Sequence, residues 1–184
     1  ACAAPGGKSF AAAIAMDCKG NILSCDIHPH KQKLIVAGAK RLGIDCIRTA
    51  VMDGKQFEPD LAEDFDLVIA DVPCSGLGII RKKPDIRYKD PEQLRGLPEV
   101  QSAILDNVSR YVKPGGTLLY ATCTLLIWEN EAVIGAFLDR NNRFTLEPFQ
   151  LPGPIGRAEK GMLTLWPHIH NTDGFFIAKL RRKG

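Results

Sequence analysis

The chain has 184 residues, a length that predicts a single domain. Apolar residues make up 45% and charged residues 24%, which excludes a disordered tail, a collagen-like fibre and a small disulfide-stapled scaffold. Lys and Arg exceed Asp and Glu by 24 to 21, and this formal charge of +3 is too small to establish a polyanionic partner. No apolar run approaches the roughly 20 residues of a spanning helix, and no secretory signal opens the chain.

The six cysteines form no CxxC pair and have no histidine at zinc spacing, so we expect neither a structural zinc site nor any other metal. Free thiols in a reducing cytoplasm are the expected state. Cys18, Cys25 and Cys46 are expected to be small buried apolar groups. Cys2 lies in a glycine loop, and Cys74 and Cys123 each follow a predicted strand.

Short β-rich runs alternate with segments of helical period. Strands are predicted at Asn21–Asp26, Cys46–Val51, Phe65–Ala70, Thr117–Ala121, Arg143–Glu147 and Gly174–Leu180. Helices are predicted at Gly7–Asp17, from Pro29 to Gly43, at Pro98–Val112 and at Glu129–Asn141. This order predicts an α/β fold with a doubly wound, mostly parallel sheet and an antiparallel C-terminal strand.

The chain opens directly on Pro5-Gly6-Gly7-Lys8-Ser9, a glycine loop of the kind that follows the first strand of a doubly wound fold. We therefore expect the chain to be a fragment whose first strand is missing. A P-loop needs a glycine five residues before Gly7, where Cys2 stands, and the GxGxxG spacing also fails. The spacing leaves a generic ligand loop or a plain tight turn.

Two acids follow the next predicted strands. Asp26 lies 19 positions after Gly7, close to the spacing at which an acid binds ribose hydroxyls in this architecture. It is equally suited to cap the helix that begins at Pro29. Asp53 lies just after the following strand, at the same predicted sheet edge, but Asp53-Gly54 is also an ordinary turn pair.

The strongest predicted strand runs directly into Asp71-Val72-Pro73-Cys74-Ser75-Gly76. A buried acid without a role is costly, and a cysteine near helix N–H groups or basic residues loses its proton more easily, so a reactive Cys74 is expected. The alternative is an Asp that caps a loop beside an inert cysteine. Tyr120-Ala121-Thr122-Cys123-Thr124 places a second cysteine at the same edge, and Glu129-Asn130-Glu131 then begins a helix, with simple capping expected for Glu131.

Together these segments resemble the Sun-type RNA (cytosine-5)-methyltransferase family, and within it the bacterial small-subunit ribosomal RNA enzymes. The matching segments, in chain order, are Cys2–Lys8, Asp71–Gly76, Ile80-Arg81-Lys82-Lys83-Pro84-Asp85-Ile86, Lys113–Gly116, Ala121–Cys123 and Asp173-Gly174-Phe175-Phe176. They span almost the whole chain. Thr124 stands where the family usually has Ser.

The resemblance implies a Rossmann-like methyltransferase domain over residues 1–184 that uses S-adenosylmethionine. The loop of Cys2, Ala3, Ala4, Pro5, Gly6, Gly7 and Lys8 would hold the amino-acid portion of the cofactor. Asp26 would bind the ribose hydroxyls, Asp53 would lie on the adenine side, and Asp71 would lie nearest the methyl group and the target base.

The resemblance also implies that Cys123 is the nucleophile and that Cys74 helps to release the product. A thiolate that adds to carbon 6 of cytosine makes carbon 5 reactive, and Asp71 is expected to hydrogen-bond the base. The target must lie outside a helical stack, so single-stranded or loop RNA is the expected partner, and we expect the protein to be a monomer.

Arg81, Lys82, Lys83, Arg87 and Lys89 follow the Cys74 loop and are candidates to contact RNA phosphates, or else form an ordinary solvated face. Other readings stay open at this point: a transfer RNA or DNA cytosine methyltransferase, in the latter case with Cys74 as nucleophile, and a non-catalytic ribosome assembly factor. A P-loop nucleotidase is disfavoured because position 2 is not glycine.

Overall fold

The computed structural model describes all 184 residues, which divide into two compact units, Ala1–Gln56 and Phe57–Gly184. Each unit is described by itself. The expected single methyltransferase domain over residues 1–184 stays a prediction. No helix has both the length and the apolar character needed to cross a membrane.

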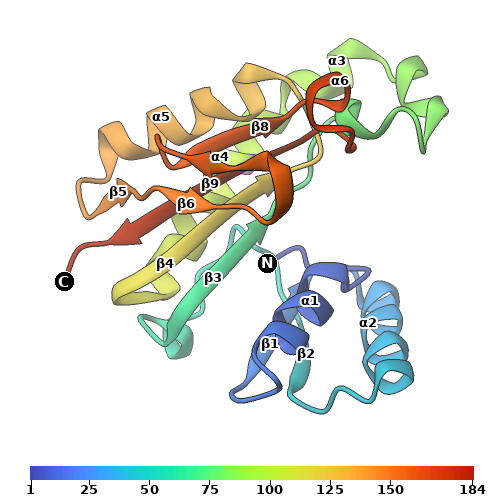
Figure 1. Ribbon diagram of the computed structural model, residues 1–184. Helices are drawn as coiled ribbons and strands as arrows, with labels where there is room; N and C mark the ends of the chain where they lie inside the picture. Colours follow the sequence, from blue (N-terminus) through green and yellow to red (C-terminus); the bar gives the residue numbers. More distant parts are fainter. The chain divides into compact units, whose positions relative to one another are not determined.

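The first unit is a βαβ arrangement preceded by a helix (Figure 1). Helix α1 (Gly7–Ala15) leads to strand β1 (Ile22–Asp26), helix α2 (Pro29–Leu42) and strand β2 (Ile47–Val51). Strands β1 and β2 pair in parallel, from Ile22 opposite Ile47 to Asp26 opposite Val51. The proline at the first position of α2 and the left-handed Gly43 at its end are the start and stop that the sequence predicts.

The second unit is built on a mixed sheet with the order β3-β4-β9-β5, and β8 pairs with β9 (Figure 1). Its strands are β3 (Phe65–Asp71), β4 (Val112–Thr122), β5 (Phe144–Leu146), β8 (Met162–Leu165) and β9 (Phe175–Arg182), and a small ribbon pairs β6 (Phe149–Gln150) with β7 (Arg157–Ala158). Strands β3 and β4 are parallel, whereas β9 runs antiparallel to β4. The predicted antiparallel C-terminal strand is therefore confirmed.

Two helices cover this sheet. Helix α4 (Leu97–Val108) contacts β3 and α5 (Glu131–Arg140), and each buries an apolar face. In the sheet, Tyr120 and Phe176 are fully buried, and their rings meet edge to face with centroids 6.2 Å apart. The remaining helical pieces are short: α3 (Pro91–Arg95), α6 (Pro167–His170) and 3₁₀ turns at η1 (Pro59–Leu61), η2 (Leu77–Ile79), η3 (Pro84–Tyr88), η4 (Ser109–Tyr111), η5 (Ile127–Glu129) and η6 (Gly153–Ile155).

Three sequence expectations need correction. The helix predicted to reach Val112 ends as a 3₁₀ turn at Tyr111, since Val112 already pairs with Phe65 as part of β4. The helix predicted to begin at Glu129 is split, because Asn130 has non-helical backbone angles. Of the three cysteines expected in the core, only Cys46 is buried. Cys18 lies partly exposed in a left-handed turn after α1, and Cys25 is half-buried.

Candidate active site

The second unit brings two thiols together at the carboxyl ends of β3 and β4. These strands are parallel, with Asp71 opposite Ala121, so the loops that follow them leave the same edge of the sheet. The Sγ atoms of Cys74 and Cys123 lie 3.2 Å apart, and the backbone N–H of Cys123 donates to the Cys74 sulfur over 3.3 Å. Asp71, the last residue of β3, is half-buried at this edge.

Cys74 differs from the sequence expectation in its ionisation. The hydrogen bond with Cys123 and burial both raise the pKa of the Cys74 thiol, with the neighbouring sulfur adding electrostatic repulsion. A low pKa was expected from nearby basic residues. Of these basic residues, Lys89 binds the loop, through a 2.9 Å hydrogen bond from its ammonium group to the Ser75 carbonyl oxygen. Arg81 and Lys82 pair with Asp173 instead. Burial and the neighbouring sulfur therefore favour the protonated form of Cys74, and the geometry allows either thiol to donate to the other.

A buried carboxylate lies beneath both cysteine loops. Glu129 has no exposed surface, and its Oε2 atom accepts hydrogen bonds from the Ser75 backbone N–H over 2.9 Å and from the Gln101 amide over 2.8 Å. Its Oε1 atom accepts from the Thr124 hydroxyl over 3.4 Å. The same Gln101 nitrogen donates to the Pro73 carbonyl oxygen over 2.9 Å. One carboxylate thus contacts the residue after Cys74 and the residue after Cys123.

Asn130 holds the Cys123 loop from its other side. Its side-chain oxygen accepts from the Thr122 hydroxyl over 2.6 Å, and its side-chain nitrogen donates to the Thr124 carbonyl oxygen over 3.1 Å. Asn130 has no exposed surface. The residues that flank Cys123 are therefore tied to a single side chain.

Two glycines pack where no side chain fits. The backbone N–H of Gly78 donates to the Cys123 carbonyl oxygen over 3.0 Å, and the Gly174 N–H donates to the Gly78 carbonyl oxygen over 2.8 Å. A Cβ atom at Gly78 would lie 2.1 Å from the Gly174 oxygen, which is impossible without moving backbone. The segment after Asp173 therefore supports the loop after Cys74, which in turn supports the Cys123 loop.

The basic segment after Cys74 is partly neutralised. Lys82 lies 2.5 Å and Arg81 3.4 Å from the carboxylate of Asp173, which is almost buried. These two cations lower the pKa of Asp173. Both cations remain mostly exposed, while Lys89 is occupied with the Ser75 carbonyl oxygen. The expected phosphate contacts therefore stay a prediction, carried by Arg81, Lys82, Lys83 and Arg87 rather than by Lys89.

In the first unit, the Cys2–Lys8 loop folds back onto the end of β1. The Ala3 N–H donates to the Cys25 carbonyl oxygen, and the Gly6 N–H donates to the Ala3 carbonyl oxygen, both over 2.8 Å. Gly6 has φ of 110°, a conformation that favours glycine, and it precedes α1 without any side-chain cap. The loop therefore presents an uncapped helix N-terminus, which suits an anionic or polar group of a ligand.

Asp26 is the residue that organises this loop. It is only 6% exposed, and its two carboxylate oxygens accept from the backbone N–H groups of Ala4 (3.1 Å) and His28 (3.0 Å). Each carboxylate oxygen has a second acceptor position, so binding of ribose hydroxyls is compatible with these bonds. Helix α2 has no side-chain cap, so the bond to His28 orders the approach to the helix rather than capping it. The residues fit the cofactor that the sequence implies.

Asp53 forms a local turn, which is one of the two roles that the sequence allows for it. Its Oδ1 atom accepts from the Lys55 backbone N–H over 3.0 Å, which is the local turn bond expected of an Asp-Gly pair. Its predicted position on the adenine side of a cofactor stays a prediction.

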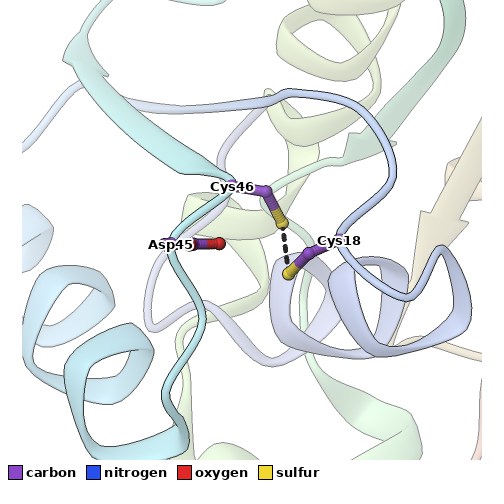
Figure 2. Close-up of side chains that lie close together, drawn as sticks. All are labelled: Cys18, Asp45 and Cys46. Carbon is purple, nitrogen blue, oxygen red and sulfur yellow. Dashed lines mark hydrogen bonds between the residues drawn. The ribbon is translucent and has the colours of Figure 1, made fainter.

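A second sulfur pair lies at the opposite end of β2 from Asp53. Figure 2 shows the side chains of Cys18 and Cys46 pointing at each other beside Asp45, and the two sulfurs are 2.7 Å apart. Their hydrogen bond and burial raise the pKa of Cys46. Two Zn–S bonds at a tetrahedral angle hold their sulfurs about 3.8 Å apart, so this cluster does not have the spacing of a zinc site. The expected absence of a metal stays a prediction.

The sequence reasoning missed Glu129 and Gln101. A helix does begin in the Glu129–Glu131 segment, at Glu131, whose side chain accepts from the Thr164 hydroxyl over 3.2 Å. Glu129 lies before this helix, in η5. Gln101 was an unremarked polar residue in a helix. No local pattern marks either residue as part of the site, because Trp128, the neighbour of Glu129, is itself 57% exposed and does not predict burial.

The fold and the site together define an α/β protein of the Rossmann-like methyltransferase class. The defining features are the parallel strand pairs, the mixed sheet covered by helices, the glycine loop at the end of β1 and the two thiols at a strand edge. Solved structures agree. The methyltransferase homologue protein from Pyrococcus horikoshii superposes with a TM-score of 0.81 at 31% identity, over 98% of this chain and 59% of its own. NSun6 from the same organism, solved with SFG, gives a TM-score of 0.79 at 29% identity, over 99% and 46%.

Sequence comparison narrows the class to a family. The family described as 16S rRNA methyltransferase RsmB/F matches residues 1–181. The chain is 45% identical to the probable ribosomal RNA small subunit methyltransferase B of Bacillus subtilis, over all of this chain and 42% of that protein. It is 36% identical to the ribosomal RNA small subunit methyltransferase F of Escherichia coli, over 98% of this chain and 39% of that protein.

The chain belongs to the 16S rRNA methyltransferase RsmB/F family. This result confirms the predicted family, the α/β Rossmann-like fold class and S-adenosylmethionine as the cofactor of the class. The chain spans less than half the length of the curated relatives it matches.

Proposed function

We propose that the protein containing this chain transfers the methyl group of S-adenosylmethionine to carbon 5 of a cytosine in small-subunit ribosomal RNA, in the cytoplasm. The observation that supports this most directly is the pair of thiols 3.2 Å apart at the carboxyl ends of β3 and β4. The names of the B and F relatives support the ribosomal substrate over transfer RNA or DNA.

We assign the nucleophile to Cys123. Its thiolate adds to carbon 6 of the cytosine, and the new C–S bond turns carbon 5 into an enamine-like nucleophile. S-adenosylmethionine, when bound, supplies the electrophilic methyl group. Loss of the carbon-5 proton to a base then breaks the C–S bond and returns the thiolate. The Cys74 S–H, whose pKa is raised, stabilises the thiolate of Cys123 as a hydrogen-bond donor before addition.

Cys74 and Asp71 take the remaining roles. Cys74 lies close enough to Cys123 to assist expulsion of that thiolate, which is the step that releases the product. Asp71 hydrogen-bonds the amino or ring-nitrogen side of the base and stabilises charge as it develops. In the first unit, the Cys2–Lys8 loop and Asp26 hold the cofactor. An RNA cytosine outside a helical stack can reach these partly exposed thiols without the cost of unpairing a duplex.

The test is methyl transfer from radiolabelled S-adenosylmethionine to small-subunit ribosomal RNA by the protein that contains this chain. The proposal predicts label in 5-methylcytosine after nuclease digestion. Label in another nucleoside would contradict the proposal. RNA binding without any methyl transfer would also contradict it and would favour a non-catalytic assembly factor. Equal transfer to transfer RNA or DNA would overturn the substrate assignment.

A further inference from the structure

We infer that Glu129 is the positioning residue of the reaction: its carboxylate fixes the distance between the Cys74 and Cys123 sulfurs. The expected effect on catalysis rests on the proposed function, whereas the effect on the distance between the two sulfurs does not. Cys74 and Cys123 lie 49 positions apart on separate loops, so something other than chain connectivity must hold them in register.

Glu129 is the side chain that bridges the two loops directly. Its Oε2 atom holds the Ser75 N–H, one residue past Cys74, and its Oε1 atom holds the Thr124 hydroxyl, one residue past Cys123. The loops also bond to each other at this point, through the Ser75 and Thr124 hydroxyls over 2.7 Å. Each cysteine is therefore one residue away from a shared, fully buried acceptor.

The carboxylate is itself held from below. Gln101, fully buried on α4, donates from its side-chain amide nitrogen to both the Glu129 carboxylate and the Pro73 carbonyl oxygen, and the Tyr120 hydroxyl donates to the Glu129 backbone oxygen over 2.6 Å. These partners come from a helix and from a central strand of the sheet. Glu129 thereby transmits their position to both cysteines.

All of these donors to the carboxylate are uncharged, so the side chain acts here as a hydrogen-bond acceptor and not as the partner of a cation. A glutamine at position 129 can preserve the same network. Its amide oxygen accepts from Ser75 and Gln101, and its amide nitrogen donates to the Thr124 hydroxyl, which can donate in turn to Ser75. Alanine instead leaves the Ser75 backbone N–H and one N–H of the Gln101 amide buried without partners, while the other Gln101 N–H keeps the Pro73 carbonyl oxygen.

The spacing of the thiols can be measured without any turnover. Phenylarsine oxide condenses with two neighbouring thiols to form two As–S bonds and one water, with no change in oxidation state. Because Cys18 and Cys46 are also close together, the assay uses a Cys18→Ser, Cys46→Ser background, and peptide mapping places the adduct at Cys74 and Cys123. Glu131→Ala is the matched control, since Glu131 is two residues away and contacts Thr164 rather than a cysteine loop.

We expect Glu129→Ala to weaken the arsenical adduct at least tenfold and to lower kcat by about 100-fold, the effect of displacing a reacting group by about an ångström. KM for RNA and for cofactor stays within about threefold, because no binding contact is lost. Glu129→Gln restores both readouts to within a small factor of the parent, and Glu131→Ala leaves both unchanged.

If Glu129→Ala does not fold, Thr124→Val provides the test, since it removes the Oε1 link, the bond to Ser75 and the long bond from the Leu126 N–H while leaving the Oε2 bonds of Glu129 in place. The inference is overturned if Glu129→Ala or Thr124→Val keeps the parent adduct and kcat, or if Glu129→Gln is as inactive as Glu129→Ala. Failure of the parent protein to methylate cytosine would overturn the proposed function instead, and the arsenical readout would still decide the positioning role.

Discussion

The Cys74 and Cys123 sulfurs lie 3.2 Å apart, and the backbone N–H of Cys123 also points at the Cys74 sulfur. This relationship follows from the parallel pairing of β3 and β4, which brings the loop after each strand to one edge of the sheet. The two thiols have the same chemistry but different neighbouring groups. Burial and the neighbouring sulfur raise the pKa of Cys74, and the Cys74 sulfur also accepts from the Cys123 backbone N–H.

The close contact between Gly78 and Gly174 predicts a steric failure. Gly78→Ala would place a Cβ atom 2.1 Å from the Gly174 oxygen and 2.9 Å from the Cys123 oxygen. We expect a loss of roughly 2 kcal/mol or more in unfolding free energy, as for overpacked cores, together with loss of methyl transfer. Urea unfolding measures the first effect. Gly96→Ala, where an added Cβ meets nothing within 4 Å, should stay near the parent, and equal stability of both variants would refute the packing argument.

Loss of a hydrogen bond at Asp26 should weaken cofactor binding. Asp26→Asn keeps one acceptor oxygen but turns an amide N–H toward the Ala4 or His28 N–H, so the glycine loop loses one of its two anchors. We expect affinity for S-adenosylhomocysteine, measured by calorimetry, to fall by about tenfold or more, the cost of one lost charge-assisted bond. Asp45→Asn, an exposed acid of the same unit, serves as the control. Unchanged affinity in Asp26→Asn would remove Asp26 from the cofactor site.

Glu147 predicts a pH-dependent contribution to stability. Hydrogen bonds from Arg181 and Lys179 lower the pKa of Glu147 to about 2. A carboxylate with a depressed pKa stabilises the fold fully above its ordinary pKa of 4.5, and this contribution is lost as the pH falls toward 2. Glu147→Gln should therefore be less stable than the parent at pH 7, by no more than about 1 kcal/mol for each exposed ion pair, and this difference should shrink as the pH falls from 4.5 toward 2. Thermal unfolding across this pH range checks the effect, and a difference as large at pH 2 as at pH 7 would contradict it.

The parts of this molecule that sequence reasoning predicted are those governed by local pattern. The proline before α2, the glycine after it and the apolar run of β3 each specify an element through backbone chemistry and periodicity. The meeting of Cys74 and Cys123 was predictable because parallel strands bring their carboxyl ends to one edge.

Contacts that depend on tertiary packing were not predictable in the same way. Nothing local to Glu129 indicates that it will accept from Ser75, 54 positions earlier in the chain. The raised pKa of Cys74 likewise depends on burial and on the neighbouring sulfur, which together override the basic residues nearby in sequence. Such properties emerge only when several elements converge, so the pattern of any one of them carries no signal.

The most direct test of the account is covalent trapping on small-subunit RNA that carries 5-fluorocytidine, with S-adenosylmethionine present. Fluorine at carbon 5 cannot leave as a proton does, so the protein–RNA adduct persists and is seen as a shifted band on a denaturing gel. The account predicts that the parent and Cys74→Ser form the adduct and that Cys123→Ser does not. An adduct with Cys123→Ser and none with Cys74→Ser would contradict the account and assign the nucleophile to Cys74.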